Sequence, residues 1–198
     1  MAVDRGPVLK KCRTLGISPA VLGLDKHIKE DKSGKQRKKL SEYGLQLREK
    51  QKAKFIYGVL ERSFRNYFAK AEKMKGQTGE NLMITLERRL DNVVFRMGLA
   101  RTRREARQIV GHKHVLVNGK TVNIPSYLVS AGDKIEISEK AKETKRYKEI
   151  IDITGGRIAP SWIETDIENM KATIKNLPTR EEIDVPVDEM LIVELYSK

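Results

Sequence analysis

The chain has 198 residues, of which 39% are hydrophobic and 34% are charged, and its net charge is +13. This length allows one or two domains with apolar cores, and the composition is polar without being that of a disordered chain. The excess of lysine and arginine favours nucleic acid or an anionic membrane surface as the partner. No apolar run approaches the roughly 18 residues of a membrane span, and the N-terminus lacks the apolar core of a signal peptide. We therefore expect a cytoplasmic protein.

The basic charge is concentrated toward the N-terminal end. Residues 1–75 contain 20 lysines and arginines against 8 acidic residues, whereas residues 158–198 contain 4 against 9. The first part is suited to meet phosphate, and the last part to contact protein or solvent. Cys12 is the only cysteine, so the sequence excludes intramolecular disulfides and cysteine-cluster metal sites. We expect no metal and no other cofactor.

Residues 1–40 form a basic extension that glycine and proline interrupt, and it includes the basic run at residues 35–39. Two interpretations remain open. The segment is either a solvated tail without fixed structure or an extension that becomes ordered only on RNA. Folding on binding would satisfy both.

Residues 41–87 are expected to form a helical domain. Ser41 is a suitable helix cap, and apolar residues recur every three to five positions from there to Met74, which predicts continuous helix. Basic residues lie largely between the apolar positions. Five of them are predicted to contact RNA: Arg48, Lys50, Lys54, Arg62 and Arg65.

The stretch from Leu86 to Ile137 is the most informative part of the chain. Its periodicity predicts one helix that ends at Gly98 and a second that begins at Thr102, where Thr102 and Glu105 match a capping box. The region between residues 88 and 107 contains seven arginines and no lysine. The planar guanidinium pairs with phosphate in a fork, so this bias indicates RNA recognition.

Five of these arginines are predicted RNA-binding residues that the two helices display close together: Arg89, Arg96, Arg103, Arg104 and Arg107. As exposed side chains, Arg103 and Arg107 are expected to contribute to RNA binding and little to stability.

Alternating apolar residues around Asn118-Gly119 predict a β-hairpin, since a type I′ turn needs positive φ at both central positions. A third strand is expected after Gly132-Asp133. The loop before the hairpin contains two histidines, but no further metal-binding residue lies near them in the sequence. An RNA-facing loop is therefore favoured over a metal site. Predicted RNA contacts here are His112, Lys113, His114, Asn118 and Lys120.

The remainder of the chain is less regular. Residues 139–150 are a charged connector for which a helix is one option, and irregular structure is predicted after Gly155-Gly156. The apolar run from Leu191 to Val193 fits either a strand or a short helix after Asp188. The whole pattern predicts an α+β fold, with a helical N-terminal domain and a small antiparallel sheet next to the two-helix and hairpin module.

The sequence offers little support for catalysis. Arg89-Leu90-Asp91 resembles the signature of pseudouridine synthases, but Asp91 lies among arginines and is expected to pair with one of them. No glycine-rich phosphate loop is present, and three histidines leave little material for a Ser/His/Asp arrangement. We expect a binding protein and not an enzyme.

Several motifs, in the right order, resemble bacterial small-subunit ribosomal protein number four. They lie at residues 43–51, 89–94, 102–103, 106–108, 117–119, 125–127, 132–133 and 191–198. The resemblance covers residues 41–198. Many relatives carry four zinc-binding cysteines near the N-terminus, and with Cys12 alone this chain resembles the zinc-free type.

The resemblance implies a domain plan. Residues 41–87 are the helical domain, to which residues 178–198 return, residues 88–150 are the RNA-binding module, and residues 151–177 complete the second domain. It also implies binding to a helical junction in the 5′ domain of 16S rRNA, nucleation of subunit-body assembly and a contribution to decoding accuracy. Ribosomal proteins five and three are the implied neighbours, near the mRNA entrance. Binding to its own mRNA, as a translational self-repressor, stays open.

Two other functions compete with this interpretation. An RNA-modifying enzyme can use such a module as an accessory, but the residues after the module are few and lack a plausible active site. A free-standing regulatory RNA-binding protein is the second rival. The ribosomal ending and the long basic N-terminal half argue against it.

Overall fold

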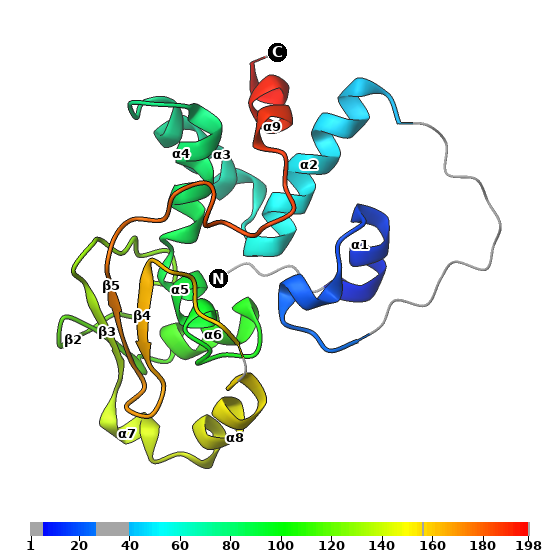
Figure 1. Cartoon of the computed structure of the whole chain (residues 1–198). Coiled ribbons are helices and arrows are strands. Elements are labelled where there is room, and N and C mark those ends of the chain that lie inside the picture. The colour runs from blue at the N-terminus through cyan, green and yellow to red at the C-terminus, as the bar shows by residue number, and fades with distance from the viewer. Residues whose placement is uncertain (1–5, 27–39, 156, 198) are drawn as a thin grey trace. The chain divides into compact units, whose positions relative to one another are not determined.

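The computed structural model describes residues 6–26, 40–155 and 157–197 (Figure 1). The chain divides into two compact units. Unit 1 combines the N-terminal part of the chain up to Leu82 with the segment that starts at Val185, and unit 2 comprises Met83–Asp184. The predicted α+β class is confirmed, because helices make up unit 1 and an antiparallel sheet lies in unit 2. The basic run at residues 35–39 lies outside the described residues.

Unit 1 is helical. Its helices are α1 (Val8–Leu15), the 3-10 helix η1 (Pro19–Leu22), α2 (Glu42–Tyr57), α3 (Glu61–Glu72), the first half of α4 (Thr78–Glu87) and α9 (Glu189–Tyr196). Helix α9 lies along α2 (Figure 1), and the Tyr196 ring stacks on Phe68 with centroids 4.4 Å apart. The last part of the chain therefore completes the core around Phe64 and Phe68, which are buried on α3.

The basic extension is helical in the part that the structure describes. Helix α1 and η1 occupy residues 8–22, and Cys12 and Ile17 are buried. A solvated tail without structure is therefore the wrong interpretation for these residues. The apolar residues of this segment and the glycines that follow each helix are sequence signals for this outcome.

Unit 2 places helices beside a sheet. Its elements are α5 (Leu90–Arg96), α6 (Arg103–Gly111), β1 (Val115–Val117), β2 (Lys120–Thr121), β3 (Lys134–Ile137), α7 (Glu139–Lys142), α8 (Lys145–Thr154), β4 (Ile163–Asp166) and β5 (Lys171–Ile174). The strands form an antiparallel sheet in the order β2-β1-β3-β5-β4. Buried residues of its strands, such as Ile135 and Ile174, share one core with Val94 of α5 and Ile109 of α6. The core thus fixes α5 and α6 against one face of the sheet.

Two helices that the sequence predicts as continuous are broken in the structure. Helix α2 ends at Gly58, whose φ is 62° and whose N–H donates to the carbonyls of Lys54 and Phe55. The other break separates α4 from α5 at Arg88 and Arg89, where the backbone of Arg89 is extended. The apolar periodicity runs through both breaks, so it could not reveal them.

The C-terminal half differs from the prediction in one further place. Strands β4 and β5 form a hairpin between residues 163 and 174, where irregular structure was predicted. The apolar run from Leu191 to Val193, for which a strand and a helix were both open, lies in helix α9. The Asp188 side chain caps this helix by accepting from the N–H of Met190 at 3.0 Å. The charged connector contains the two helices α7 and α8.

Candidate nucleic-acid interface

Asp91 holds two of the predicted RNA-binding arginines. It lies in the first turn of α5 and is 1% exposed. Its Oδ1 accepts from Nε of Arg89 at 3.0 Å, and its Oδ2 accepts from Nη2 of Arg89 at 2.6 Å and from Nη2 of Arg107 at 2.7 Å. The expected pairing of Asp91 with an arginine is confirmed. Asp91 thereby ties α6 to the start of α5.

Glu87 forms a second buried centre with Arg96 and Asn92. Its carboxylate accepts from Nη2 of Arg96 at 2.9 Å and from Nδ2 of Asn92 at 2.6 Å. Burial would lower the pKa of Arg96, but Glu87 and then Asp184 outweigh it and raise that pKa. Asn92 in turn accepts from Nε of Arg103 at 2.7 Å. The polar centre is therefore satisfied on both sides, as buried ionic groups require.

The ring of Phe95 contacts two guanidinium groups. The guanidinium carbon of Arg103 is 4.3 Å from the ring centroid, and that of Arg157 is 4.2 Å from it. Arg157 also donates to the carbonyls of Phe95 and Ala100, each at 3.0 Å. Burial, followed by the charge of Arg96, lowers the pKa of Arg157. These contacts fix the short connection between α5 and α6.

Arg103 and Arg107 are therefore not the exposed side chains that the sequence predicted. Arg103 is 7% exposed, and the side chain of Arg107 is 15% exposed. The premise that alanine at either position would leave stability little changed is therefore contradicted, and we now expect a loss of stability, because both arginines pair with buried polar groups of α5. Helical spacing places an arginine on a face but does not say which acidic partner lies opposite it.

The predicted N-terminus of α6 is confirmed. Thr102 Oγ1 accepts from the N–H of Glu105 at 3.2 Å. The Glu105 carboxylate accepts from the N–H of Arg101 at 2.8 Å, one residue before the usual position in a capping box. Burial would raise the pKa of Glu105, but hydrogen bonds from Arg101 and Arg146 hold it below its ordinary value. Glu105 is thus both a cap and an anchor for arginines.

The outer face of α6 continues into an exposed basic loop. Arg104 is exposed on this helix, and His112 and Lys113 follow it, the latter with φ of 65°. His114 is half-buried, and its Nδ1 lies 3.0 Å from the hydroxyl of Tyr147. Burial, followed by the charges of His112 and Arg146, lowers the pKa of His114 and so disfavours its charged form. Lys113 supplies an exposed ammonium group to this loop.

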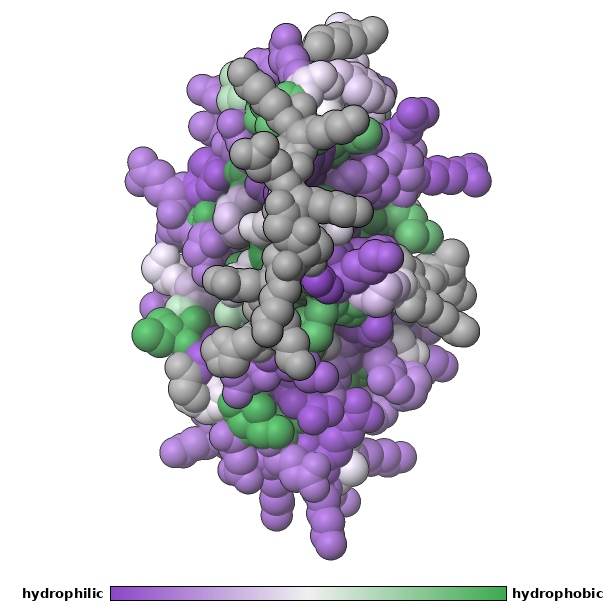
Figure 2. Space-filling view, turned by 90° about the vertical axis from the view of Figure 1, so that its right-hand side faces the viewer, coloured by the Kyte–Doolittle hydropathy of each residue, from purple (hydrophilic) through white to green (hydrophobic). Residues whose placement is uncertain are grey.

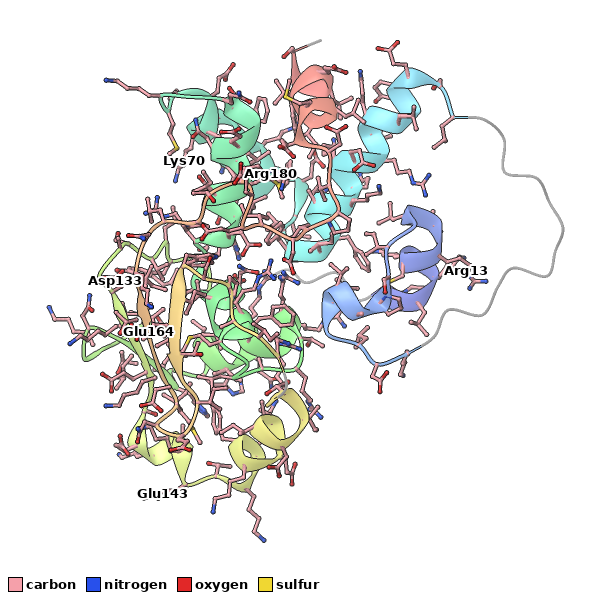
Figure 3. All side chains as sticks on the ribbon, in the orientation of Figure 1. Arg13, Lys70, Asp133, Glu143, Glu164 and Arg180 are labelled. Atoms are coloured by element: carbon pink, nitrogen blue, oxygen red, sulfur yellow. The ribbon has the colours of Figure 1, made fainter. Side chains whose placement is uncertain are left out.

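The predicted hairpin is confirmed, with φ of 50° at Asn118 and 76° at Gly119. Asn118 Oδ1 accepts from the N–H of Lys134 at 2.9 Å, and its Nδ2 donates to Asp133 at 2.8 Å. Asp133 is labelled in Figure 3, at the turn before β3. Asn118 therefore pins the hairpin to β3, and Lys120 is left exposed at the start of β2.

The predicted RNA-binding residues of unit 1 have three different environments. Lys50 and Lys54 donate to Glu61 at 3.0 and 2.6 Å. Arg62 and Arg65 are exposed on α3. Arg48 is half-buried, and its Nε is buried without a hydrogen-bond partner among the described residues. Hydrophilic residues predominate on the face drawn in Figure 2, and apolar residues form separate small areas on it.

Other kinds of site find little support in the part of the chain that the structure describes. No group of three or more histidine, cysteine, aspartate or glutamate side chains there is arranged to hold a metal ion. None of the described helices is long and apolar enough to cross a membrane.

Comparison with known families assigns both parts of the chain. Residues 4–87 match the ribosomal protein S4/S9 N-terminal domain, and residues 88–135 match the S4 domain. The small ribosomal subunit protein uS4 of Lachnospira eligens is 67% identical over 198 residues, which is 100% of both chains. The chain belongs to the uS4 family. This family consists of structural proteins of the ribosome and is not a class of enzymes.

Other uS4 proteins show the same relationship. That of Agathobacter rectalis is 66% identical over the full length of both chains. That of Caldicellulosiruptor saccharolyticus is 62% identical over 165 residues, which cover 83% of this chain and 79% of the relative.

Sequence reasoning missed two arginines of the uS4 chain's structural network. Arg146 lies in the charged connector, where nothing in the spacing indicates that it reaches Glu105 at 3.0 Å. Arg157 follows the Gly155-Gly156 pair, in a stretch that was predicted to be irregular. Both contacts join residues far apart in the chain, so only the fold reveals them.

Proposed function

We propose that the chain is a structural component of the small ribosomal subunit that binds 16S rRNA directly. The observation that carries this proposal is that some arginines of unit 2 pair with polar groups in its interior, whereas others are exposed. Buried arginines pair with Glu87, Asp91 and Asn92 and hold α5 and α6 in place. Basic groups on α6 and on the loop after it are exposed, so phosphate can reach them. A rigid display of this kind suits a folded RNA better than a flexible basic tail does.

In this mechanism, phosphate neutralisation supplies affinity and the fixed spacing of the cations supplies selectivity for shape. The residues proposed to contact RNA directly are exposed in the structure: Arg62, Arg65, Arg104, His112, Lys113 and Lys120. We propose that Lys50, Arg89, Arg96, Arg103 and Asn118 act mainly by holding these groups in position. Arg48, Lys54, Arg107 and His114 are partly exposed and combine both roles.

The finer assignment follows the resemblance noted from the sequence. We propose that the target is a helical junction in the 5′ domain of 16S rRNA and that binding there nucleates assembly of the subunit body. The same resemblance supports neighbours in ribosomal proteins five and three near the mRNA entrance, a contribution to translational accuracy, and a cytoplasmic location within the small subunit. Repression of its own message is a further proposal for this chain.

Salt dependence of binding tests the electrostatic part of the proposal. Log affinity for a 5′-domain transcript of 16S rRNA should fall linearly with log salt concentration. Six to ten phosphate contacts predict a slope of roughly −4 to −9. A slope near zero in filter-binding titrations would contradict the proposal. Co-sedimentation with small subunits separates a ribosomal role from that of a free-standing regulator.

A further inference from the structure

Two carboxylates in unit 2 each hold two arginines, but their surroundings differ. At Asp91, the side chains of Arg89 and Arg107 are 6% and 15% exposed. At Glu105, the side chains of Arg101 and Arg146 are 51% and 45% exposed. The first arrangement belongs to the interior of the unit. The second presents its cations to the surroundings.

The Glu105 carboxylate of α6 joins α8 and the connection before α6 at one oxygen atom. Oε1 accepts from Nη2 of Arg101 at 3.1 Å and from Nη2 of Arg146 at 3.0 Å. Arg101 precedes α6 and also donates its Nε to Oε2 at 3.2 Å, whereas Arg146 comes from the first turn of α8. Because one oxygen holds both guanidinium groups, the two must lie close together. Glu105 is itself 8% exposed and is fixed by the cap of α6.

The remaining donors of this pair are unused. Within the described residues, Nη1 of Arg101 and both Nε and Nη1 of Arg146 form no hydrogen bond. One carboxylate charge also balances only one of the two cations, so the group keeps a net positive charge. The nearby Glu149 acts on Arg101 electrostatically and forms no ion pair with it. Guanidinium forks with free donors are the preferred partners of phosphate.

We propose that Arg101 and Arg146, held by Glu105, form a clamp for a single phosphodiester group of RNA. This inference rests on the proposed function and adds a specific contact to it. Arg146 lies beyond residues 88–135, which match the S4 domain, so the clamp recruits α8 to the RNA-binding surface. The carboxylate orients the two forks before RNA arrives, which reduces the entropy lost on binding.

A matched pair of variants on α8 tests the clamp. Arg146→Ala is expected to weaken binding to the 5′-domain transcript about five- to tenfold and to make the salt slope shallower by about 0.7 to 0.9. Lys148→Ala removes the same charge from an exposed position on the same helix that forms no ion pair in the described structure. It is expected to change affinity less than twofold. Equal losses for the two variants would overturn the clamp.

A double variant tests whether both arginines hold one phosphate. Arg101→Ala combined with Arg146→Ala should cost little more affinity than either change alone, since each single change already breaks the clamp. If the two fold-losses multiply, the arginines act separately and the clamp is refuted.

Glu105→Gln separates the clamp from general attraction. The change raises the net charge by one, so diffuse electrostatics alone predicts tighter binding. The clamp predicts weaker binding by the folded variant, because the two arginines lose their common anchor. The α8 variants decide the question even if Glu105→Gln does not fold. Failure of the wild-type chain to bind the transcript would instead refute the proposed function.

Discussion

Glu87 and Asp91 are the residues on which the arginine network of unit 2 depends. Each is 1% exposed, and each accepts hydrogen bonds from arginines with little exposure, Arg96 at Glu87 and Arg107 at Asp91. A buried pair is costly to break, because the remaining ion loses both water and its partner. The conformation of α5 and α6 is therefore sensitive to these acids as well as to the arginines.

Asp91→Ala should lower the free energy of unfolding by about 3 kcal/mol, since it removes the buried carboxylate that pairs with two arginines of little exposure. Chemical denaturation followed by circular dichroism measures the change. Glu164→Ala is the control. The Glu164 side chain is 65% exposed, and its ion pair with Lys175 is long, at 3.7 Å, so its loss should cost less than about 0.5 kcal/mol. Equal effects of the two substitutions would mean that the buried network does not stabilise the unit.

Residue-level prediction from sequence succeeded where the signal is local. The pairing of Asp91 and the turn at Asn118 follow from neighbouring residues, and both were predicted. The burial of Arg103 and its hydrogen bond to Asn92 depend on the angle between α5 and α6, which the sequence does not show. Candidate site residues could therefore be named from the sequence, whereas the division into exposed and buried groups needed the fold.

At the level of elements, local signals gave the starts of helices better than their breaks. The cap at Thr102 was predicted because its side chain acts within three residues. The break at Gly58 was missed because the apolar stripe of α2 continues into α3. The hairpin of β4 and β5 was missed because no strong turn pair marks it, since Met170 occupies the left-handed position with φ of 53°.

Thr102→Ala should destabilise unit 2 by about 1 kcal/mol, because it removes the acceptor for the Glu105 N–H at the start of α6. Thr102→Ser retains the hydroxyl and should restore most of this loss. Thermal melts of the three proteins measure the effect. RNA affinity should change little in the folded Thr102→Ala protein, and a large loss of affinity would indicate a direct contact by Thr102.

Two glycines in the same region should respond to alanine in opposite directions. Gly119→Ala should cost about 1 kcal/mol, because alanine at a φ of 76° is strained. Gly111→Ala should stabilise by about 0.5 kcal/mol, because Gly111 is helical and an added Cβ would meet nothing within 4 Å. Urea unfolding of both variants gives the comparison. Destabilisation by both would show that the turn geometry is not the cause.

At the scale of a whole unit, Glu61 of α3 links its own helix to α2 and α9. It accepts from Lys50 and Lys54 of α2, and the Tyr196 hydroxyl of α9 lies 3.3 Å from it. Burial would raise the pKa of Glu61, but the two lysines outweigh it and lower that pKa to about 2. Burial, followed by the charge of Glu61, raises the pKa of Tyr196 to about 12.

The lowered pKa of Glu61 predicts a pH dependence. Its folded-state pKa lies below its ordinary value of 4.5, so its contribution is complete above that value and is lost as the pH falls toward about 2. Glu61→Gln should melt at a lower temperature than the wild type at pH 7, and the difference should shrink between pH 4.5 and 2. Glu72→Gln, at an exposed position on the same helix, is the control. A difference that stays constant with pH would refute the assignment.

The position of α9 also has a consequence for synthesis. Domains generally fold as units while the chain emerges from the ribosome. Every residue of unit 2 is made before α9, whose Tyr196 covers Phe68 of α3. A nascent chain that has reached residue 184 therefore contains every residue of unit 2, while the helical unit still lacks the residues of its closing helix. Translation order thus supplies all of unit 2 before the last helix of unit 1.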